Sequence, residues 1–271
     1  MIKNRIVDFF SHQPYLEQNT TYLNYRPGLN NPFAGIVWEA YEVNNFDSAK
    51  NLALPDICAD IMTLYTPKRA YCYLMSGTDG ARSMRDIEFI DDVHTITGIK
   101  FVPGSIGNIF REDVRDAGGE AIEAENIMFN GNSVVYDLKN AERFEERMQV
   151  LGNYLTTRLQ DGYETDYLAN YVTRRILETH GMIKLGDLAD ETGYTDRYLR
   201  KVMGQKLGMT MKTFSQIVQM QWSYHLGNEQ LSESNLALLA QMCGYYDQSH
   251  MNASYKKLTG MLPKDAFLLY R

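Results

Sequence analysis

Two stretches in the last third of the chain follow nearly the same pattern: LADETGYTDRYL at residues 188–199 and LAQMCGYYDQSHM at residues 239–251. In each stretch a Leu-Ala pair is followed, three residues later, by Gly-Tyr and a polar segment. A later glycine ends each copy, and these two glycines, Gly208 and Gly260, lie 52 residues apart. The pattern therefore indicates an internal repeat, in which one structural unit is present twice.

Each copy predicts two helices joined by a sharp turn. A Leu-Ala pair on the first helix lets the second helix pack closely, and the glycine adopts a turn conformation that residues with a Cβ atom resist. Thr195 and Asp247 are good N-terminal caps, so we expect them to begin the second helix of each copy. The sequence thus predicts two helix-turn-helix units, at about residues 184–205 and 235–257, joined by one helix of about residues 211–226.

Apolar residues four positions apart mark the buried side of each second helix, with Leu199 and Met203 in the first copy and Met251 and Tyr255 in the second. The outward positions are rich in Arg, Lys, Gln, Asn and Ser, which are side chains that hydrogen-bond base edges and phosphates. The candidate contacts to the major groove of double-stranded DNA are Thr195, Arg197, Arg200, Lys201, Gln248, Ser249, His250, Asn252 and Lys256.

The charge of the chain is divided unevenly along its 271 residues, a length that favours two domains. Residues 1–170 carry 15 Lys+Arg and 25 Asp+Glu, a balance of −10, whereas residues 171–271 carry 12 and 9, a balance of +3. The two balances return the −7 of the whole chain. An acidic body with a mildly basic end is compatible with a DNA-binding domain joined to an acidic sensor domain, although many enzymes show a similar division.

The first half of the chain has a different pattern from the repeat. From about Tyr22 to Val135, short β-rich and aromatic segments alternate with turn signals such as Arg26-Pro27-Gly28. This spacing predicts a β-rich, barrel-like sensor domain at residues 1–136, a helical connector at 137–165 and an all-α DNA-binding domain at 166–271. The predicted fold class is therefore α+β, with the two helix-turn-helix units in tandem at the C-terminal end.

The connector carries an apolar stripe at helical spacing, formed by Phe144, Met148, Leu151, Leu155 and Leu159. Its flanks alternate Glu and Arg, as the edges of a two-helix seam often do. The stripe admits two interpretations. It forms the seam of a homodimer, which we expect, or it packs on the sensor domain of the same chain.

The repeat resembles the DNA-binding domain of AraC/XylS-type bacterial transcription regulators. The residues that carry the resemblance are Gly244–His250, followed by Lys256-Lys257, Gly260 and Pro263. The N-terminal part resembles one sensor subgroup of that family, through Leu54-Pro55-Asp56 with Asp60-Ile61, and through residues 98–104, GIKFVPG. The resemblance implies a sequence-specific and effector-responsive regulator, an activator rather than a repressor, with RNA polymerase as a partner and two recognition helices in successive major grooves.

Three positions depart from the family pattern. Met211 stands where the family usually has proline, Ala253 where it often has arginine, and Gln219 where arginine is common. The loss of positive groups should weaken the contacts that the second unit makes with DNA. We therefore expect the first unit to supply more of the specificity. The alternative is an antagonist or interaction protein, built on a regulator scaffold, that no longer binds DNA.

Aromatic residues of the sensor domain form either its core or a pocket for a small-molecule effector, because pockets in small barrels are apolar with a few polar groups. The candidate effector-binding residues are Trp38, Tyr41, Asp56 and Arg85.

No pattern typical of a catalytic, metal or cofactor site is present in the sequence. The five histidines are scattered without an HExxH motif, and Cys58, Cys72 and Cys243 give no CxxC spacing. A DNA-repair methyl acceptor would need a zinc-bound cysteine cluster, which the sequence lacks. We therefore expect a protein that is not an enzyme. The cysteine usage and the lack of an 18-residue apolar run predict a cytoplasmic protein without a membrane span.

Overall fold

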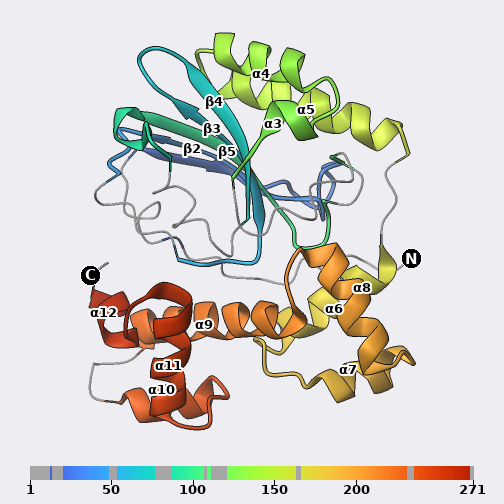
Figure 1. Ribbon diagram of the computed structural model, residues 1–271, viewed down its shortest axis with the longest axis vertical. Coiled ribbons are helices and arrows are strands. Elements are labelled where there is room, and N and C mark those ends of the chain that lie inside the picture. Colours follow the sequence, from blue (N-terminus) through green and yellow to red (C-terminus); the bar gives the residue numbers. More distant parts are fainter. Residues whose placement is uncertain are drawn as a thin grey trace.

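The computed structural model describes residues 13, 21–48, 54–76, 87–106, 109–110, 121–162, 166–230 and 235–268. Its first part is a β-sheet covered by helices, and its second part consists of helices alone (Figure 1). The predicted α+β architecture, with a β-rich part followed by a helical C-terminal part, is therefore confirmed.

The sheet has six strands in the order β1-β2-β5-β3-β4-β6, and every neighbouring pair is antiparallel. Within the described residues the two outer strands, β1 and β6, do not pair with each other, so the sheet is open at both edges. The short 3₁₀ helix η1, Ile90–Asp92, precedes β5. The strands are β1 (Tyr22–Tyr25), β2 (Val37–Asn44), β3 (Ala59–Tyr65), β4 (Ala70–Ser76), β5 (Thr95–Phe101) and β6 (Ile122–Glu123).

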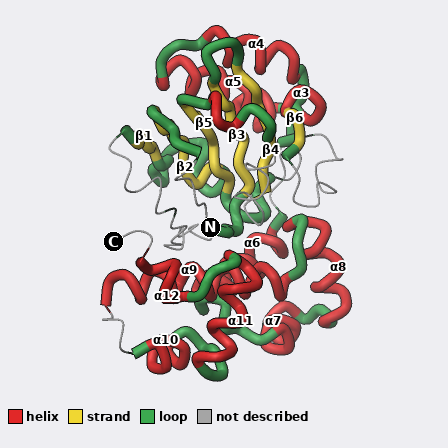
Figure 2. The backbone as a smooth tube through the Cα atoms, turned by 60° about the vertical axis from the view of Figure 1, so that its left-hand side comes forward, coloured by secondary structure: helices red, strands yellow, loops and turns green. Residues whose placement is uncertain are grey.

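Three helices cover one face of this sheet: α3 (Ala124–Ile127), α4 (Gly131–Asn140) and α5 (Phe144–Gln160). Figures 1 and 2 show them as a layer on the side of the sheet away from the C-terminal helices. Because side chains alternate along a strand, every second residue of the central strands points into this layer. Ile61 of β3 and Ile99 of β5 accordingly share one core with Leu151 and Leu155 of α5.

The apolar stripe of α5 therefore packs within its own chain. Leu151 and Leu155 are 1% and 3% exposed, and Met148 and Leu159 pack against the same core. Four of the five stripe residues thus pack within the chain, and the two at its centre are not free to form a seam between two copies. This is the second of the two interpretations of the pattern, and it corrects the expectation of a dimer through this helix.

The C-terminal part has seven helices within the described residues. The expected N-caps are confirmed, because the side chains of Thr195 and Asp247 accept hydrogen bonds from the backbone at the start of α8 and α11. The helices are α6 (Tyr167–Glu178), α7 (Leu185–Thr192), α8 (Asp196–Leu207), α9 (Met211–Gln230), α10 (Leu236–Met242), α11 (Gln248–Thr259) and α12 (Pro263–Leu268).

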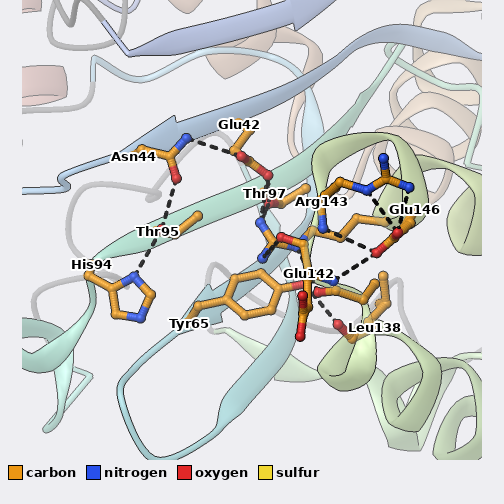
Figure 3. Close-up of polar contacts among 12 residues, drawn as sticks. Glu42, Asn44, Tyr65, His94, Thr95, Thr97, Leu138, Glu142, Arg143 and Glu146 are labelled. Carbon is orange, nitrogen blue, oxygen red and sulfur yellow. Dashed lines mark hydrogen bonds and ion pairs between the residues drawn. The ribbon is translucent and has the colours of Figure 1, made fainter.

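A buried ion pair fixes α5 to the sheet. Arg147 Nη1 lies 2.6 Å from Glu42 Oε2, and its guanidinium lies 4.0 Å from the ring centroid of Tyr65. Thr97 Oγ1 also donates to Glu42 Oε2 at 2.9 Å, and Tyr65 Oη donates to the Leu138 carbonyl oxygen at 3.0 Å. Figure 3 shows Glu42, Thr97, Tyr65 and Leu138 in this network between the sheet and the helices.

We expect Arg147→Met to lower the free energy of unfolding by about 3–5 kcal/mol, because it leaves the buried Glu42 carboxylate without its cation. Arg143→Met is the matched control at the N-cap of the same helix, since Arg143 is exposed and forms its ion pair at the surface, with Glu146. Urea unfolding followed by circular dichroism measures both changes. Equal stability of the two variants would contradict the role assigned to Arg147.

Candidate nucleic-acid interface

The first helix-turn-helix unit consists of α7, a turn and α8. Gly193 ends α7 in the left-handed conformation, with φ of +72°, which glycine adopts without the strain that a Cβ atom causes. Thr195 then accepts a hydrogen bond from the Tyr198 N–H at 3.3 Å and begins α8. Leu199 and Met203 of α8 are fully buried, so the opposite side of this helix faces solvent.

The second unit repeats this construction with α10 and α11. Gly244 also has φ of +72°, and Asp247 accepts a hydrogen bond from the His250 N–H at 2.7 Å. Met251 and Tyr255 are fully buried. The Tyr255 hydroxyl donates to the Met220 carbonyl oxygen at 3.1 Å and lies 2.8 Å from Ser223 Oγ, and both of these residues belong to α9.

Helix α9 is part of the core of both units. Its first half contributes Met211, Phe214 and Ile217 to the core that holds Leu188 and Leu199 of the first unit. Its second half contributes residues such as Tyr224 and Leu226 to the core of the second unit. The two second helices, α8 and α11, are thus packed on opposite halves of one continuous helix.

The candidate DNA contacts lie on the solvent-facing sides of α8 and α11, as predicted from the spacing. Eight of the nine are exposed, and Asn252 is half-buried. Thr195 in addition caps α8. The exposed eight are Thr195, Arg197, Arg200, Lys201, Gln248, Ser249, His250 and Lys256.

The cations of this domain fall into two groups. Those on the inner side are paired, with Arg175 bound to Glu191 at 2.6 Å and Lys206 to Asp166 at 2.9 Å. The hydrogen bonds from Arg175 lower the pKa of Glu191 to about 2. Within the described part of the chain, the outward cations have no ion-pair partner, so their charge is available to an anionic ligand. On α8 and α11 these cations include Arg197, Arg200, Lys201 and Lys256, and Lys184, Lys212 and Lys257 are likewise exposed without an ion pair to any described residue.

Three exposed tyrosines beside the turns were missed by the sequence analysis. Tyr194 and Tyr198 stack with ring centroids 4.8 Å apart at the start of α8, and Tyr246, which is 89% exposed, precedes α11. Both Tyr194 and Tyr246 directly precede the N-cap residue, so an aromatic side chain stands at the same place in both units. The signal in the sequence was a tyrosine one or two residues after each turn glycine, Tyr194 after Gly193 and Tyr246 after Gly244.

One ring nitrogen of His250 has a hydrogen-bond partner within the chain. Its Nδ1 atom accepts a hydrogen bond from the Tyr246 N–H at 3.3 Å, and its ring meets that of Tyr245 edge-on. An accepting Nδ1 carries no proton, so the neutral ring has its N–H group at Nε2. Nε2 is therefore the atom of His250 that is left as a hydrogen-bond donor.

Of the three departures from the family pattern, Gln219 has a defined local role. Gln219 Nε2 donates to the Cys243 carbonyl oxygen at 2.7 Å, so this amide satisfies the end of α10 beside the turn of the second unit. Met211 is buried at the start of α9. Ala253 is exposed on α11 and adds no charge there.

Three of the candidate effector-binding residues are buried near the boundary between the two parts of the chain. Trp38 packs in the core of the first unit, and Tyr41 packs on the face of the sheet opposite α3–α5. Asp56 is 3% exposed and forms an ion pair with Lys100 at 2.8 Å. Trp38, Tyr41 and Asp56 thus belong to packed regions, and Arg85 lies outside the described residues.

A buried polar cluster surrounds Lys100 on that face of the sheet. Burial lowers the pKa of Lys100, the charges of Asp56, Asp60 and Glu39 raise it, and the net direction is upward. Asp60 is half-buried, but its Oδ1 atom is enclosed and has no hydrogen-bond partner in the described part of the chain. Burial is the main cause that raises the pKa of Asp60 to about 7, with Lys100 opposing and Asp56 adding to the shift.

The described residues meet neither the requirements of a metal site nor those of a membrane-spanning helix. Among the described residues no group of three or more His, Cys, Asp or Glu side chains is arranged to hold a metal ion. None of the described helices combines the length and the apolar character that are needed to cross a membrane.

The C-terminal part is similar to a known family of protein domains. Residues 188–267 match a family profile described as "Helix-turn-helix domain". No curated protein matches the sequence.

Several solved structures resemble the chain at low identity. The C-terminal domain of AraT, a response regulator from Geobacillus stearothermophilus, is 18% identical with a TM-score of 0.35, covering 38% of this chain and 85% of that one. ToxT from Vibrio cholerae is 10% identical with a TM-score of 0.41, covering 92% and 98%. ToxT bound to an unsaturated fatty acid is 11% identical with a TM-score of 0.38, covering 93% and 96%. These values are too low to support a conclusion about function.

The raised pKa of Asp60 gives a pH-dependent prediction. Its folded-state value of about 7 lies above the ordinary value of 3.8, so its contribution to stability is complete below pH 3.8 and is lost as the pH rises through 7. We expect Asp60→Asn to raise the melting temperature at pH 8 and to change it little at pH 4.

The matched control is Asp137→Asn, at an exposed aspartate of α4, which should have little effect at either pH. Thermal unfolding at both pH values measures the difference. A lower melting temperature of Asp60→Asn at pH 8 would show that the ionised carboxylate is favourable where it lies.

Proposed function

We infer that this chain, whose residues 188–267 form a helix-turn-helix domain of the AraC type, is a transcription regulator that reads duplex DNA with both units. The observation that carries the proposal is the pair of exposed helices, α8 and α11, that rest on the two halves of α9. Each presents polar and basic side chains on its outer side, while its apolar side is buried. Such side chains donate to base edges and phosphates in the major groove.

The length of α9 supports reading by both units. It has 20 residues, and at about 1.5 Å rise per residue it spans about 30 Å. Successive major grooves on one face of DNA lie about 34 Å apart. Two recognition helices that pack on the opposite halves of such a helix are held apart by it, so we expect one chain to recognise an asymmetric site with both of them.

The proposed roles of the side chains follow from their charge. Arg197, Arg200 and Lys201 of the first unit read guanine edges or hold phosphates, because Arg and Lys pair with both. The second unit relies on Gln248, Ser249 and the Nε2 donor of His250, and also on Asn252, which is half-buried. Lys256 holds a phosphate near the end of α11. The first unit therefore supplies more of the sequence specificity.

The finer features of the proposal rest on the family resemblance. They are that the N-terminal domain binds a small-molecule effector, that the protein activates rather than represses, and that it contacts RNA polymerase. The proposal that it acts in the cytoplasm rests instead on its cysteine usage. The buried positions of Trp38, Tyr41 and Asp56 do not favour an effector that binds them directly without rearrangement. The other candidate function, an antagonist without DNA binding, is favoured by Ala253 alone.

We expect Arg200→Ala to weaken binding to the promoter beside the protein's own gene by about 1–3 kcal/mol and to relax specificity at one base position. Fluorescence anisotropy with the labelled promoter duplex and single-base variants of it measures both effects. Arg69→Ala removes the same charge from the exposed turn between β3 and β4 and should leave affinity unchanged. Tight and selective binding by Arg200→Ala would refute the assignment, and no binding by the wild-type chain would favour the antagonist.

We also expect strong salt dependence in spite of the net negative charge. The C-terminal +3 region makes the contacts, while the −10 region stays away from the phosphates. With six or more phosphate contacts, affinity should fall about a thousandfold between about 50 and 200 mM salt. Titration of the promoter duplex at several salt concentrations gives the slope, and a flat dependence would rule out phosphate contacts as the main source of affinity.

A further inference from the structure

One short segment of the N-terminal domain is buried between the two parts of the chain. This segment, Leu54–Cys58, precedes β3 and is called the strap here. All five of its residues are buried, with Leu54 2%, Asp56 3%, Ile57 3% and Cys58 2% exposed. A chain segment without helix or strand is ordinarily at the surface, because its backbone groups need hydrogen-bond partners. Its burial therefore calls for specific partners on both sides.

The two ends of the strap lie in two different cores. Leu54 packs in the core of the second unit, with Met220 and Tyr224 of α9. Ile57 and Cys58 pack in the core of the first unit, which contains Phe214 and Ile217 of α9. Trp38 of β2 joins that first core as well. The strap thus bridges the two helix-turn-helix units across the middle of the helix that they share.

A hydrogen bond fixes the middle of the strap to the same helix. Gln221 of α9, which is fully buried, donates from Nε2 to the Pro55 carbonyl oxygen at 2.9 Å. Gln221 follows Met220, so this bond lies where α9 passes from the first core to the second. A buried amide that lost such a partner would carry the full cost of its desolvation, which makes the contact specific as well as favourable.

The other side of the strap is tied to the sheet by polar contacts. Asp56 pairs through Oδ2 with Lys100 of β5 at 2.8 Å, and through Oδ1 it accepts from the Cys58 N–H at 2.9 Å. Gln13 holds Leu54 from both sides, since its Oε1 accepts from the Leu54 N–H at 3.0 Å and its Nε2 donates to the Leu54 carbonyl oxygen at 2.7 Å. The strap is therefore held in one conformation by the N-terminal domain.

We propose that the strap sets the mutual arrangement of the two helix-turn-helix units, so that the N-terminal domain controls how α8 and α11 are presented together. Without the strap, the contacts that cross from one core to the other at the middle of α9 are lost. The effect of the strap on DNA binding rests on the proposed function. Its effect on the relative position of the two helix-turn-helix units does not. The Lys100–Asp56 pair is the contact through which a change in the sheet would reach both units.

The test compares two Leu→Ala variants of the full-length chain. Leu54→Ala removes the strap from the core of the second unit. Leu64→Ala is the matched control, because Leu64 is equally buried in the N-terminal domain but packs with Val43 and Ile96, away from α9. Gln221→Met is a second strap variant, which removes the donor to Pro55 and keeps the side-chain volume.

Spin labels report the arrangement without DNA. Nitroxides attached to Gln205→Cys on α8 and Lys257→Cys on α11, both exposed positions, give the distance between the units by pulsed electron resonance. The three native cysteines are buried and so are protected from labelling. The proposal predicts one narrow distribution for wild type and Leu64→Ala, and a broadened or shifted one for Leu54→Ala and Gln221→Met. Unchanged distributions in the strap variants, or an equal change in Leu64→Ala, would overturn it.

A second measurement uses DNA. The probe is a duplex selected from a random library by the wild-type chain, together with the same duplex carrying one base pair inserted between its two halves. We expect the insertion to weaken wild-type binding by about tenfold or more, as a loss of about 1.4 kcal/mol implies, and to weaken Leu54→Ala binding clearly less. If the inserted base pair weakens binding equally for the wild-type chain and for Leu54→Ala, the proposed role of the strap is contradicted. Failure of the wild-type chain to select any duplex would instead refute the proposed function, and the spin-label distances would still decide the role of the strap.

Discussion

The C-terminal domain depends on one constraint, which is that a single helix, α9, completes two separate apolar cores. Each unit contributes short helices that cannot bury their apolar sides alone, and isolated helices of such length are marginal in water. The apolar sides of α7 and α8 pack against the first half of α9, and those of α10 and α11 pack mainly against its second half. Stability and the relative position of the two outer surfaces therefore come from the same helix, which is why a contact at its middle matters for both.

A buried ion pair lies on each face of the N-terminal sheet, and each pair fixes the element that packs on that face. On one face, Glu42 of β2 pairs with Arg147 and secures α5. On the other, Lys100 of β5 pairs with Asp56 and secures the strap. β2 and β5 are neighbours in the sheet, so the two pairs lie on adjacent strands. Because a buried ion pair contributes little net stability, its value here is to fix the position of the attached element.

The features predicted from the sequence are those that local chemistry determines. The turn glycines Gly193 and Gly244, the caps Thr195 and Asp247, and the buried Leu199 and Met251 all depend on neighbours a few residues away, and all are confirmed. The exposure of the candidate DNA contacts follows from the same periodicity.

The features that were not predicted depend on partners far along the chain. The stripe on α5 shows that one side of the helix is buried, but its period is the same against a second copy or against the sheet. The sequence indicated Asp56 as an effector ligand, whereas in the structure its carboxylate accepts from the Cys58 N–H and pairs with Lys100. Its ion pair joins residues 44 positions apart, however, and Gln221 reaches Pro55 across 166. The spacing of residues along the sequence carries no information on such long-range contacts. The sequence therefore showed Leu54-Pro55-Asp56 as a motif but did not indicate that this segment joins the two parts of the chain.

The central claim is that the strap and α9 form one cooperative unit, and native-state hydrogen exchange tests it directly. The backbone N–H groups of Leu54 and Cys58 are buried and hydrogen-bonded, so their exchange reports opening of the strap. The account predicts that they exchange with the same opening free energy as the amides in the middle of α9, because neither opens without the other. Rapid exchange at Leu54 and Cys58 while the α9 amides remain protected would contradict it.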